Sequence, residues 1–340
     1  MKNRGWAALA VILMVGVLSA CGSKGEVKDS AGGTKANSTA VTTSAGESKS
    51  SGSAESGETR TITYLDKTYT VPAKAQRIVI TGSIESMEDA LVLDVTPTGA
   101  ITVGGKFPSL FTKITEGTVG IGEKTQPDLE GILKLKPDVI LASTKFPAET
   151  LEKFAKISTT IPVSHISSDW EKNLNLLAEL TGKQEQAKQL LEKYKSDLAE
   201  VRKTLNPVFK DKKVLAIRIR KGSICIYPQN VFFNPSIYEE LGASVPDEVA
   251  AAKAQQLISL EKFSEINPDY VFIQFSEDEN KETPKAFEEL QNNPIWKSVN
   301  AVKNGHVYTN LVDPLTQGGT AYSKFAFLEA LKNSTLMQAK

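Results

Sequence analysis

Arg218 and Arg220 are the residues of this chain whose types and spacing most directly suggest chemistry. They alternate with Ile217 and Ile219 in a segment that has the pattern of a β-strand. Because successive side chains of a strand point to opposite faces, the two guanidinium groups share one face. Two cations that enter one space are costly unless an anion is present. We therefore expect an anionic ligand here, with a nearby carboxylate or solvent at the strand end as the alternative partners.

Two lysines occupy positions that suit the same chemistry. Lys145 follows the predicted buried strand 139–142, and the carboxyl ends of such strands are where open α/β sheets bind ligands. Lys124 lies in a loop before a predicted short helix. A single loop lysine is most often only a solvated surface residue. A cluster predicts a tight anion site, because each charge-assisted hydrogen bond contributes about 1.5–3 kcal/mol.

The chain has few histidines and cysteines, which are common ligands of transition metals. It contains two histidines, His165 and His306, and two cysteines, Cys21 and Cys225. A zinc or manganese site needs a cluster of histidines and carboxylates. The sequence has neither an H-E-x-x-H nor a G-x-S-x-G motif. We predict no metal site and no catalytic residue, with an exported enzyme as the alternative, and we expect Cys225 to be buried in a strand.

The first residues have the pattern of an export signal. A cationic tip and an apolar run lead to Leu18-Ser19-Ala20, which stands directly before Cys21. The run is shorter than the roughly 20 residues that a spanning helix needs. The pattern resembles the lipobox of bacterial lipoproteins, which predicts a signal peptide over 1–20 and acylation of Cys21, for example with palmitate. An uncleaved anchor and an ordinary signal peptide are the alternatives.

Composition limits the remaining possibilities. The 340 residues carry equal numbers of acidic and basic side chains, so the formal net charge is zero. Nucleic-acid binding is not indicated, because it requires a basic domain. Residues 21–59 are rich in Ser, Gly, Thr and Lys and are predicted to form a disordered tether. The rest of the chain is long enough for two lobes.

Two halves of the chain repeat one pattern. Segments 129–141 and 260–273 each predict a short helix, a Pro-Asp turn and a buried strand, and strands at 77–80 and 213–217 open the halves. Strands that alternate with short helices favour parallel sheets covered on both faces. A helix is predicted over 183–206, about 34 Å long and ended by Pro207. It either connects two lobes or packs on one sheet.

The elements follow in the order lipobox, polar tether, first α/β half, long helix and second α/β half. In this order the chain resembles the substrate-binding lipoproteins of iron–siderophore ABC importers. It is most similar to the ferric bacillibactin (catecholate) binding type. The resemblance implies an α/β fold of two Rossmann-like lobes joined by one long α-helix, a class III substrate-binding protein with the ligand cleft between the lobes. The lobes would span 60–182 and 207–340, with 183–206 as the connecting helix.

The resemblance also implies roles for individual residues. It implies six residues that bind the ligand and one permease-docking glutamate in each lobe, to which we add two lysines as candidate rim charges. They are Lys124, Lys145, Arg218, Arg220, Lys253 and Gln255, then Lys106 and Lys221 at the rim, and Glu88 and Glu239 for docking. The docking positions are open to a shift to Glu85 or Glu240.

The resemblance implies the function of an extracytoplasmic receptor, with the chelate and a permease as its partners. A ferric tris-catecholate carries about three negative charges and fills every iron position itself, so it requires cations rather than protein metal ligands or a cofactor. We expect a lipid-anchored monomer on the outer face of the membrane of a Gram-positive cell. The alternative ligands are a hydroxamate siderophore, cobalamin and haem, the last with Tyr64, Tyr69 or Tyr308 as an axial ligand.

Overall fold

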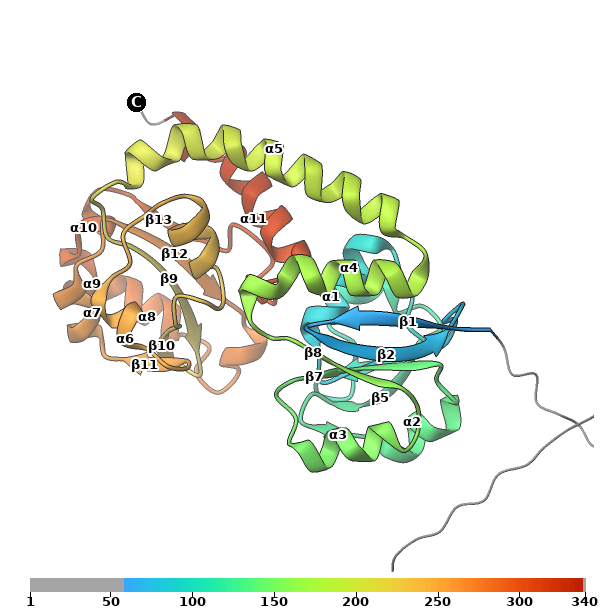
Figure 1. Cartoon of the computed structure of the whole chain (residues 1–340). Helices are drawn as coiled ribbons and strands as arrows, with labels where there is room; N and C mark the ends of the chain where they lie inside the picture. Colours follow the sequence, from blue (N-terminus) through green and yellow to red (C-terminus); the bar gives the residue numbers. More distant parts are fainter. Residues whose placement is uncertain (1–57, 339–340) are drawn as a thin grey trace, which may run out of the picture. The chain divides into compact units, whose positions relative to one another are not determined.

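The structure is a computed structural model, and it describes residues 58–338 (Figure 1). The predicted signal peptide 1–20, Cys21 and nearly all of the predicted tether 21–59 lie outside the described residues. The described fold opens with a hairpin of β1 (Thr59–Tyr64) and β2 (Lys67–Pro72), so the tether prediction runs one residue too far. None of the helices in the described part is long and apolar enough to cross a membrane.

The first sheet has six strands in the order β6-β5-β4-β3-β7-β8. All neighbouring pairs are parallel except β5 with β6. The chain leaves β3 for β4 on one side and later places β7 on the other, so the strand order reverses between β3 and β7. Such a reversal leaves a crevice at the carboxyl ends of the two strands. The strands are β3 (Ile78–Thr81), β4 (Gly99–Thr102), β5 (Val119–Glu123), β6 (Gln126–Pro127), β7 (Val139–Ser143) and β8 (Thr160–Val163).

Short helices connect and cover this sheet (Figure 1). The α-helices are α1 (Ile84–Leu93), α2 (Leu129–Leu135), α3 (Ala148–Ala155) and α4 (Trp170–Thr181), and the 3₁₀ turns are η1 (Ser109–Ile114) and η2 (Ser167–Asp169). The central strands β3 and β7 are buried along their whole length, as expected for a parallel sheet that is covered on both faces.

The second sheet has five strands in the order β11-β10-β9-β12-β13. Strands β9, β12 and β13 are parallel, whereas β10 pairs antiparallel with both of its neighbours, β9 and β11, so this sheet is mixed. Cys225 is fully buried in β10, as predicted. The strands are β9 (Val214–Arg220), β10 (Ser223–Ile226), β11 (Gln256–Ile258), β12 (Tyr270–Phe275) and β13 (Val307–Thr309).

The helical elements of this second part are numerous and mostly short. They are η3 (Ser236–Glu240), α6 (Asp247–Ala251), α7 (Leu260–Ile266), η4 (Asp278–Asn280), α8 (Ala286–Asn292), α9 (Pro294–Ser298), α10 (Asn300–Lys303), α11 (Ala321–Lys332) and η5 (Thr335–Gln338). Helix α11 packs against α1 and α4 as well as α5, so the last helix of the chain returns to the first sheet's helices.

Two equivalent turns confirm the predicted internal repeat. In the first, Asp138 accepts hydrogen bonds from the backbone N–H and the guanidinium of Arg77 directly before β3. In the second, Asp269 accepts one from the backbone N–H of Lys213 directly before β9. Helices α2 and α7 each end on a residue with positive φ before the Pro-Asp pair. The repeated Asp therefore fixes each central strand to its parallel neighbour.

The long helix α5 spans Gln184–Phe209, which is three residues beyond its predicted end. The prediction that Pro207 ends the helix is wrong. Phe209 is fully buried and its ring packs edge-on against Tyr270 of β12 at 5.2 Å, which keeps the last turn on the second sheet. Because the N-terminal part of α5 packs against α4, the helix joins the two sheet-bearing parts (Figure 1). The divisions at 182 and 206 otherwise stay predictions.

Candidate functional site

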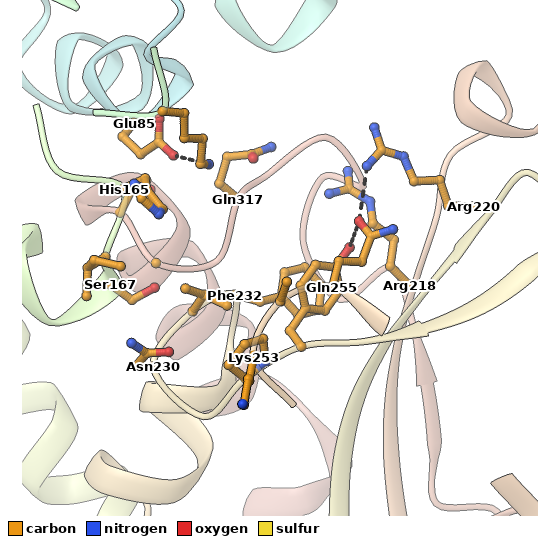
Figure 2. Close-up of a pocket in the computed structure, with 18 of the residues that line it drawn as sticks. Glu85, His165, Ser167, Arg218, Arg220, Asn230, Phe232, Lys253, Gln255 and Gln317 are labelled. Carbon is orange, nitrogen blue, oxygen red and sulfur yellow. Dashed lines mark hydrogen bonds and ion pairs between the residues drawn. The ribbon is translucent and has the colours of Figure 1, made fainter. Parts of the chain in front are cut away.

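A cavity of about 380 Å³ is lined by residues of both sheet-bearing parts (Figure 2). The structure brings together at this cavity all six residues that were expected to bind a ligand. They come from the loops after β5 and β7, from β9, and from the segment between α6 and β11: Lys124, Lys145, Arg218, Arg220, Lys253 and Gln255. Their contact with a ligand stays a prediction.

Glu85 and Lys145 form an ion pair at the point where the first sheet reverses its strand order. Lys145 follows β7 and Glu85 lies in the first turn of α1, directly after β3, with Nζ and Oε1 3.2 Å apart. The Glu85 side chain is only 7% exposed, whereas that of Lys145 is 46% exposed. The other carboxylate oxygen of Glu85 has no hydrogen-bond partner in the described part of the chain. The carboxylate thus holds the lysine at the cavity wall.

Gly82 allows the chain to turn from β3 into α1 at this place. Its φ is +66°, and a Cβ atom would lie 2.2 Å from the ring of Phe146. The turn places Ser83 as the N-cap, where its side chain accepts a hydrogen bond from the backbone N–H of Ser86. A side chain at position 82 would clash with Phe146 and strain the backbone, so the glycine is required for this turn.

Lys124 is a lysine of the cavity without a close acidic partner. No carboxylate of the described residues lies within 4.0 Å of its ammonium group. Burial lowers the pKa of Lys124, and the cations Lys145, Arg220 and Arg218 lower it further, while Glu85 acts in the opposite direction. An anion bound in the cavity removes this penalty, because it compensates both the burial and the neighbouring cations.

Arg218 and Arg220 point from β9 toward one carboxylate, that of Glu279 in η4. Arg218 Nε lies 2.8 Å from Glu279 Oε2, and Arg220 NH2 lies 3.3 Å from Oε1. Arg218 is 5% exposed and also donates to the backbone carbonyl of Pro314 at 2.8 Å. The structural partner that was considered as an alternative is therefore present. One carboxylate serves two guanidinium groups, so one positive charge of the pair is not balanced.

The charges of the cavity leave a positive excess. Five cationic side chains line it, whereas Glu85 is the acidic residue of the lining and Glu279 stands behind the two arginines. Five cations and two carboxylates give an excess of three positive charges. Positive charge held in a sheltered cleft attracts a multiply charged anion more strongly than the same charges in open water.

One wall of the cavity is aromatic. The rings of Tyr227 and Phe232 are stacked with their centroids 4.4 Å apart, and both residues line the cavity. The Tyr227 hydroxyl donates to Gln255 Oε1 at 3.2 Å, and Arg220 NH1 donates to the same oxygen at 3.2 Å. Phe232 has a φ of +60°, an unusual value for a bulky residue.

The two predicted rim lysines, Lys106 and Lys221, are exposed but do not line the cavity. The loop that carries Lys106 is held in place, since the backbone N–H groups of Gly104 and Gly105 donate to the Glu123 carboxylate at 3.1 and 2.8 Å.

The two predicted docking glutamates differ in accessibility. Glu88 is fully buried and accepts hydrogen bonds from the segment before and at the start of α11, so its prediction as a surface docking residue is wrong. Glu239 is exposed, and its role stays a prediction. Of the alternatives, Glu85 lies in the cavity, and Glu240 pairs with buried Lys324 at 2.9 Å.

Several lining residues were not predicted. His165 follows β8 at the carboxyl edge of the first sheet, and the rule that pointed to Lys145 would have found it. The others lie in loops or in a short turn that reach the cavity only in the tertiary fold, and no sequence pattern indicated them. This second group comprises Ser167, Asn230, Gln317, Gly319 and Thr320. Within the described residues, no group of three or more His, Cys, Asp or Glu side chains is placed to hold a metal ion.

The fold and cavity define a substrate-binding protein of two α/β lobes joined by a long helix, as predicted. The chain belongs to the family described as "Periplasmic binding protein", whose model matches residues 92–310. Among curated proteins it is 53% identical over 322 residues to the iron-uptake system-binding protein of Bacillus subtilis, covering 95% of both chains. It is 26% identical over 264 residues to the Fe(3+)-citrate-binding protein YfmC of the same organism, covering 76% of this chain and 80% of that protein.

Solved structures support the same assignment. The triscatecholate siderophore binding protein FeuA from Bacillus subtilis, complexed with ferri-bacillibactin, is 56% identical and superimposes with a TM-score of 0.77. The match covers 83% of this chain and 99% of that chain. The petrobactin-binding protein YclQ from Bacillus subtilis shares 23% identity with a TM-score of 0.70, which supports the fold alone. The predicted family membership is confirmed.

Proposed function

We propose that this protein is an extracytoplasmic receptor that binds a ferric tris-catecholate siderophore and delivers it to an ABC permease for iron uptake. The observation that carries the proposal is the cavity with an excess of three positive charges. A ferric tris-catecholate carries about three negative charges, which such a cavity balances. The relative FeuA, which is 56% identical, is a triscatecholate siderophore binding protein.

The arrangement supports binding without catalysis. The chain belongs to a family of binding proteins, and the iron enters as cargo, already coordinated by the chelate. Two of the cations support a role in recognition, because Lys145 and Arg220 line the cavity, are partly exposed and are each paired with a carboxylate. We propose no resident cofactor and no enzymatic activity.

The same proposal includes the location of the protein. The residues before Cys21 predict export, and acylation of that cysteine would anchor the protein to the outer face of the membrane. Two acyl chains are needed for stable attachment, since one chain binds a membrane only marginally. We propose a monomer that docks to the permease through exposed acidic side chains, with Glu239 in the second lobe as one of them.

Haem is an alternative chelate that the site does not favour. Tyr64, Tyr69 and Tyr308 do not line the cavity, and the tyrosine that does is Tyr227. Burial raises the pKa of Tyr227 to about 12, which opposes the phenolate form that an iron ligand requires. Its hydroxyl is also bonded to Gln255.

Ligand titration of the processed protein tests the proposal. Quenching of Trp170 and Trp296 fluorescence would be followed with ferric bacillibactin, ferric enterobactin, a ferric hydroxamate, ferric citrate, haem and cobalamin. We expect the two tris-catecholates to bind with nanomolar-scale affinity, about −12 kcal/mol, and the other chelates at least a hundredfold more weakly. Tightest binding of any other chelate would overturn the proposal.

A further inference from the structure

His165 lies on the cavity wall, in the loop that follows β8 and beside the loop that follows β7 (Figure 2). Its Nδ1 atom is 2.8 Å from the Thr144 hydroxyl oxygen, and Thr144 is the residue before Lys145. Because β7 and β8 are adjacent parallel strands, both loops leave the same edge of the sheet. This hydrogen bond fixes the imidazole ring beside the lysine that is expected to contact the ligand.

The other ring nitrogen of His165, Nε2, makes no hydrogen bond to any residue of the described part of the chain. A neutral imidazole has one donor and one acceptor nitrogen, whereas a protonated one donates from both. The Thr144 hydroxyl accepts as readily as it donates. The contact of Nδ1 with Thr144 is therefore compatible with a neutral or a protonated ring. The protonation state of the ring determines whether Nε2 accepts or donates a hydrogen bond.

Three charged groups of the cavity act on this imidazole, from three different segments. Burial lowers the pKa of His165, Lys145 lowers it further, Lys124 does so more weakly, and Glu85 raises it. Since an ordinary histidine titrates near pH 6.5, the ring is mostly neutral at neutral pH in the empty cavity. The cations Lys145 and Lys124 thus favour the neutral ring, and a bound anion would neutralise their effect.

We propose that His165 is a proton-linked ligand contact: the imidazole takes up one proton from solvent as the anionic chelate enters, and Nε2–H then donates to a chelate oxygen. The inference rests on the proposed function and extends it to a residue that the sequence did not indicate. The bound trianion compensates Lys145 and Lys124 and favours the charged ring. The cavity gains one positive charge only when an anion fills it.

The linkage has a definite sign. Between the pKa of His165 in the free protein and its higher pKa in the complex, binding consumes a proton. The dissociation constant therefore rises with pH in this window, by up to tenfold per pH unit. Above the pKa of the complex the ring stays neutral and the dependence disappears.

Calorimetric titration with ferric bacillibactin at pH 7.0, in phosphate and in Tris buffer, measures the proton uptake from the difference in heat between buffers. We expect the wild-type protein to take up a substantial fraction of one proton per chelate. His165→Gln keeps an amide donor but cannot titrate, so it should abolish the uptake and flatten the pH profile of the dissociation constant. His306→Gln, at a histidine stacked on Tyr270 and absent from the cavity lining, should leave the uptake unchanged.

The outcomes separate this inference from the proposed function. Binding with equal proton uptake in the wild type and in His165→Gln would overturn the role of His165 alone. Uptake that is lost in Glu85→Gln and retained in His165→Gln would assign the proton to the carboxylate instead, which also overturns it. No binding of any tris-catecholate by the wild type would overturn both proposals. Circular dichroism of each variant verifies that it is folded.

Discussion

The carboxylate of Glu88, in α1, accepts a hydrogen bond from the backbone N–H of Gln317 at 2.7 Å, although 229 residues separate them. The hydroxyl groups of Thr320 and Ser323 donate to the same carboxylate. Gln317 and Thr320 line the cavity, and Glu85 lies one turn before Glu88 on the same helix. Neighbouring positions on one face of α1 thus fix the loop before α11 and provide a charge of the cavity.

The protonation of Glu88 should make the stability of the protein depend on pH. Burial raises the pKa of Glu88 to about 7 from its usual value of 4.5, so the folded protein holds a proton that the unfolded chain releases earlier. The contribution of Glu88 to the free energy of unfolding is therefore largest below about pH 4.5, and it is lost as the pH rises through about 7. The loss amounts to roughly 3 kcal/mol. Glu88→Gln should remove this part of the decline in urea unfolding measured between pH 5 and pH 8.

A matched control for this prediction is Glu239→Gln, because Glu239 is exposed. That variant should follow the wild-type profile. Asp89, also buried, has a raised pKa for the same reason and adds a decline of the same sign, which Glu88→Gln leaves in place. The prediction would be contradicted if the free energy of unfolding changed between pH 5 and pH 8 by the same amount in the wild type and in Glu88→Gln.

The contrast between Glu88 and Arg218 shows which parts of the site the sequence predicts. The two-residue spacing of Arg218 and Arg220 fixes their common face locally, and the end of β7 fixes the position of Lys145. The burial of Glu88 depends on a loop that is distant in the sequence, and an isolated helix gives no sign of it. The continuation of α5 past Pro207 likewise depends on the contact of Phe209 with the second sheet. Local sequence patterns thus predicted the helices, the strands and the cations of the cavity. The burial of Glu88 and the end of α5 depend on tertiary contacts, which these patterns do not contain.

Replacing Lys145 and Arg220 together by alanine should weaken binding of a ferric tris-catecholate by at least about 3 kcal/mol, since each charge-assisted hydrogen bond contributes roughly 1.5–3 kcal/mol. Both side chains are partly exposed, so the fold should tolerate the change. Fluorescence titration measures the loss. Lys134→Ala with Arg202→Ala removes the same charges from exposed helix positions and should bind as the wild type does. Equal affinity of the two double variants would rule out the proposed site.

Glu85→Gln should strengthen the binding of anionic chelates. The Glu85 carboxylate repels an anion in the cavity and compensates Lys145, and the substitution removes both effects while keeping an oxygen near Nζ. We expect about tenfold tighter binding of a ferric tris-catecholate, equivalent to roughly 1.4 kcal/mol, and almost no change for a neutral ferric hydroxamate. Titration with both chelates at the same ionic strength measures the difference. Weaker binding of the tris-catecholate would mean that Glu85 contacts the ligand favourably.

Gly319 and Ser167 meet at a wall of the cavity that joins the two sheet-bearing parts. A Cβ atom at position 319 would lie 1.7 Å from Ser167 Oγ, and the backbone N–H of Ser167 donates to the Asn230 carbonyl across the same seam at 3.1 Å. Gly319→Ala should therefore push the loop before α11 away from Ser167 and weaken chelate binding. Overpacking of this kind costs about 1–3 kcal/mol.

Rescue distinguishes this steric effect from a general loss of stability. Ser167→Gly removes the Oγ and Cβ atoms that the new methyl group would meet, and leaves the Ser167 Cα atom at 3.1 Å. The double variant with Gly319→Ala and Ser167→Gly should thus bind more tightly than Gly319→Ala alone, although Ser167→Gly alone brings no gain. Affinity and thermal unfolding measured on all three variants give the coupling between the two positions. Additive effects would show that the two sites do not interact, and the seam would then not control the shape of the cavity.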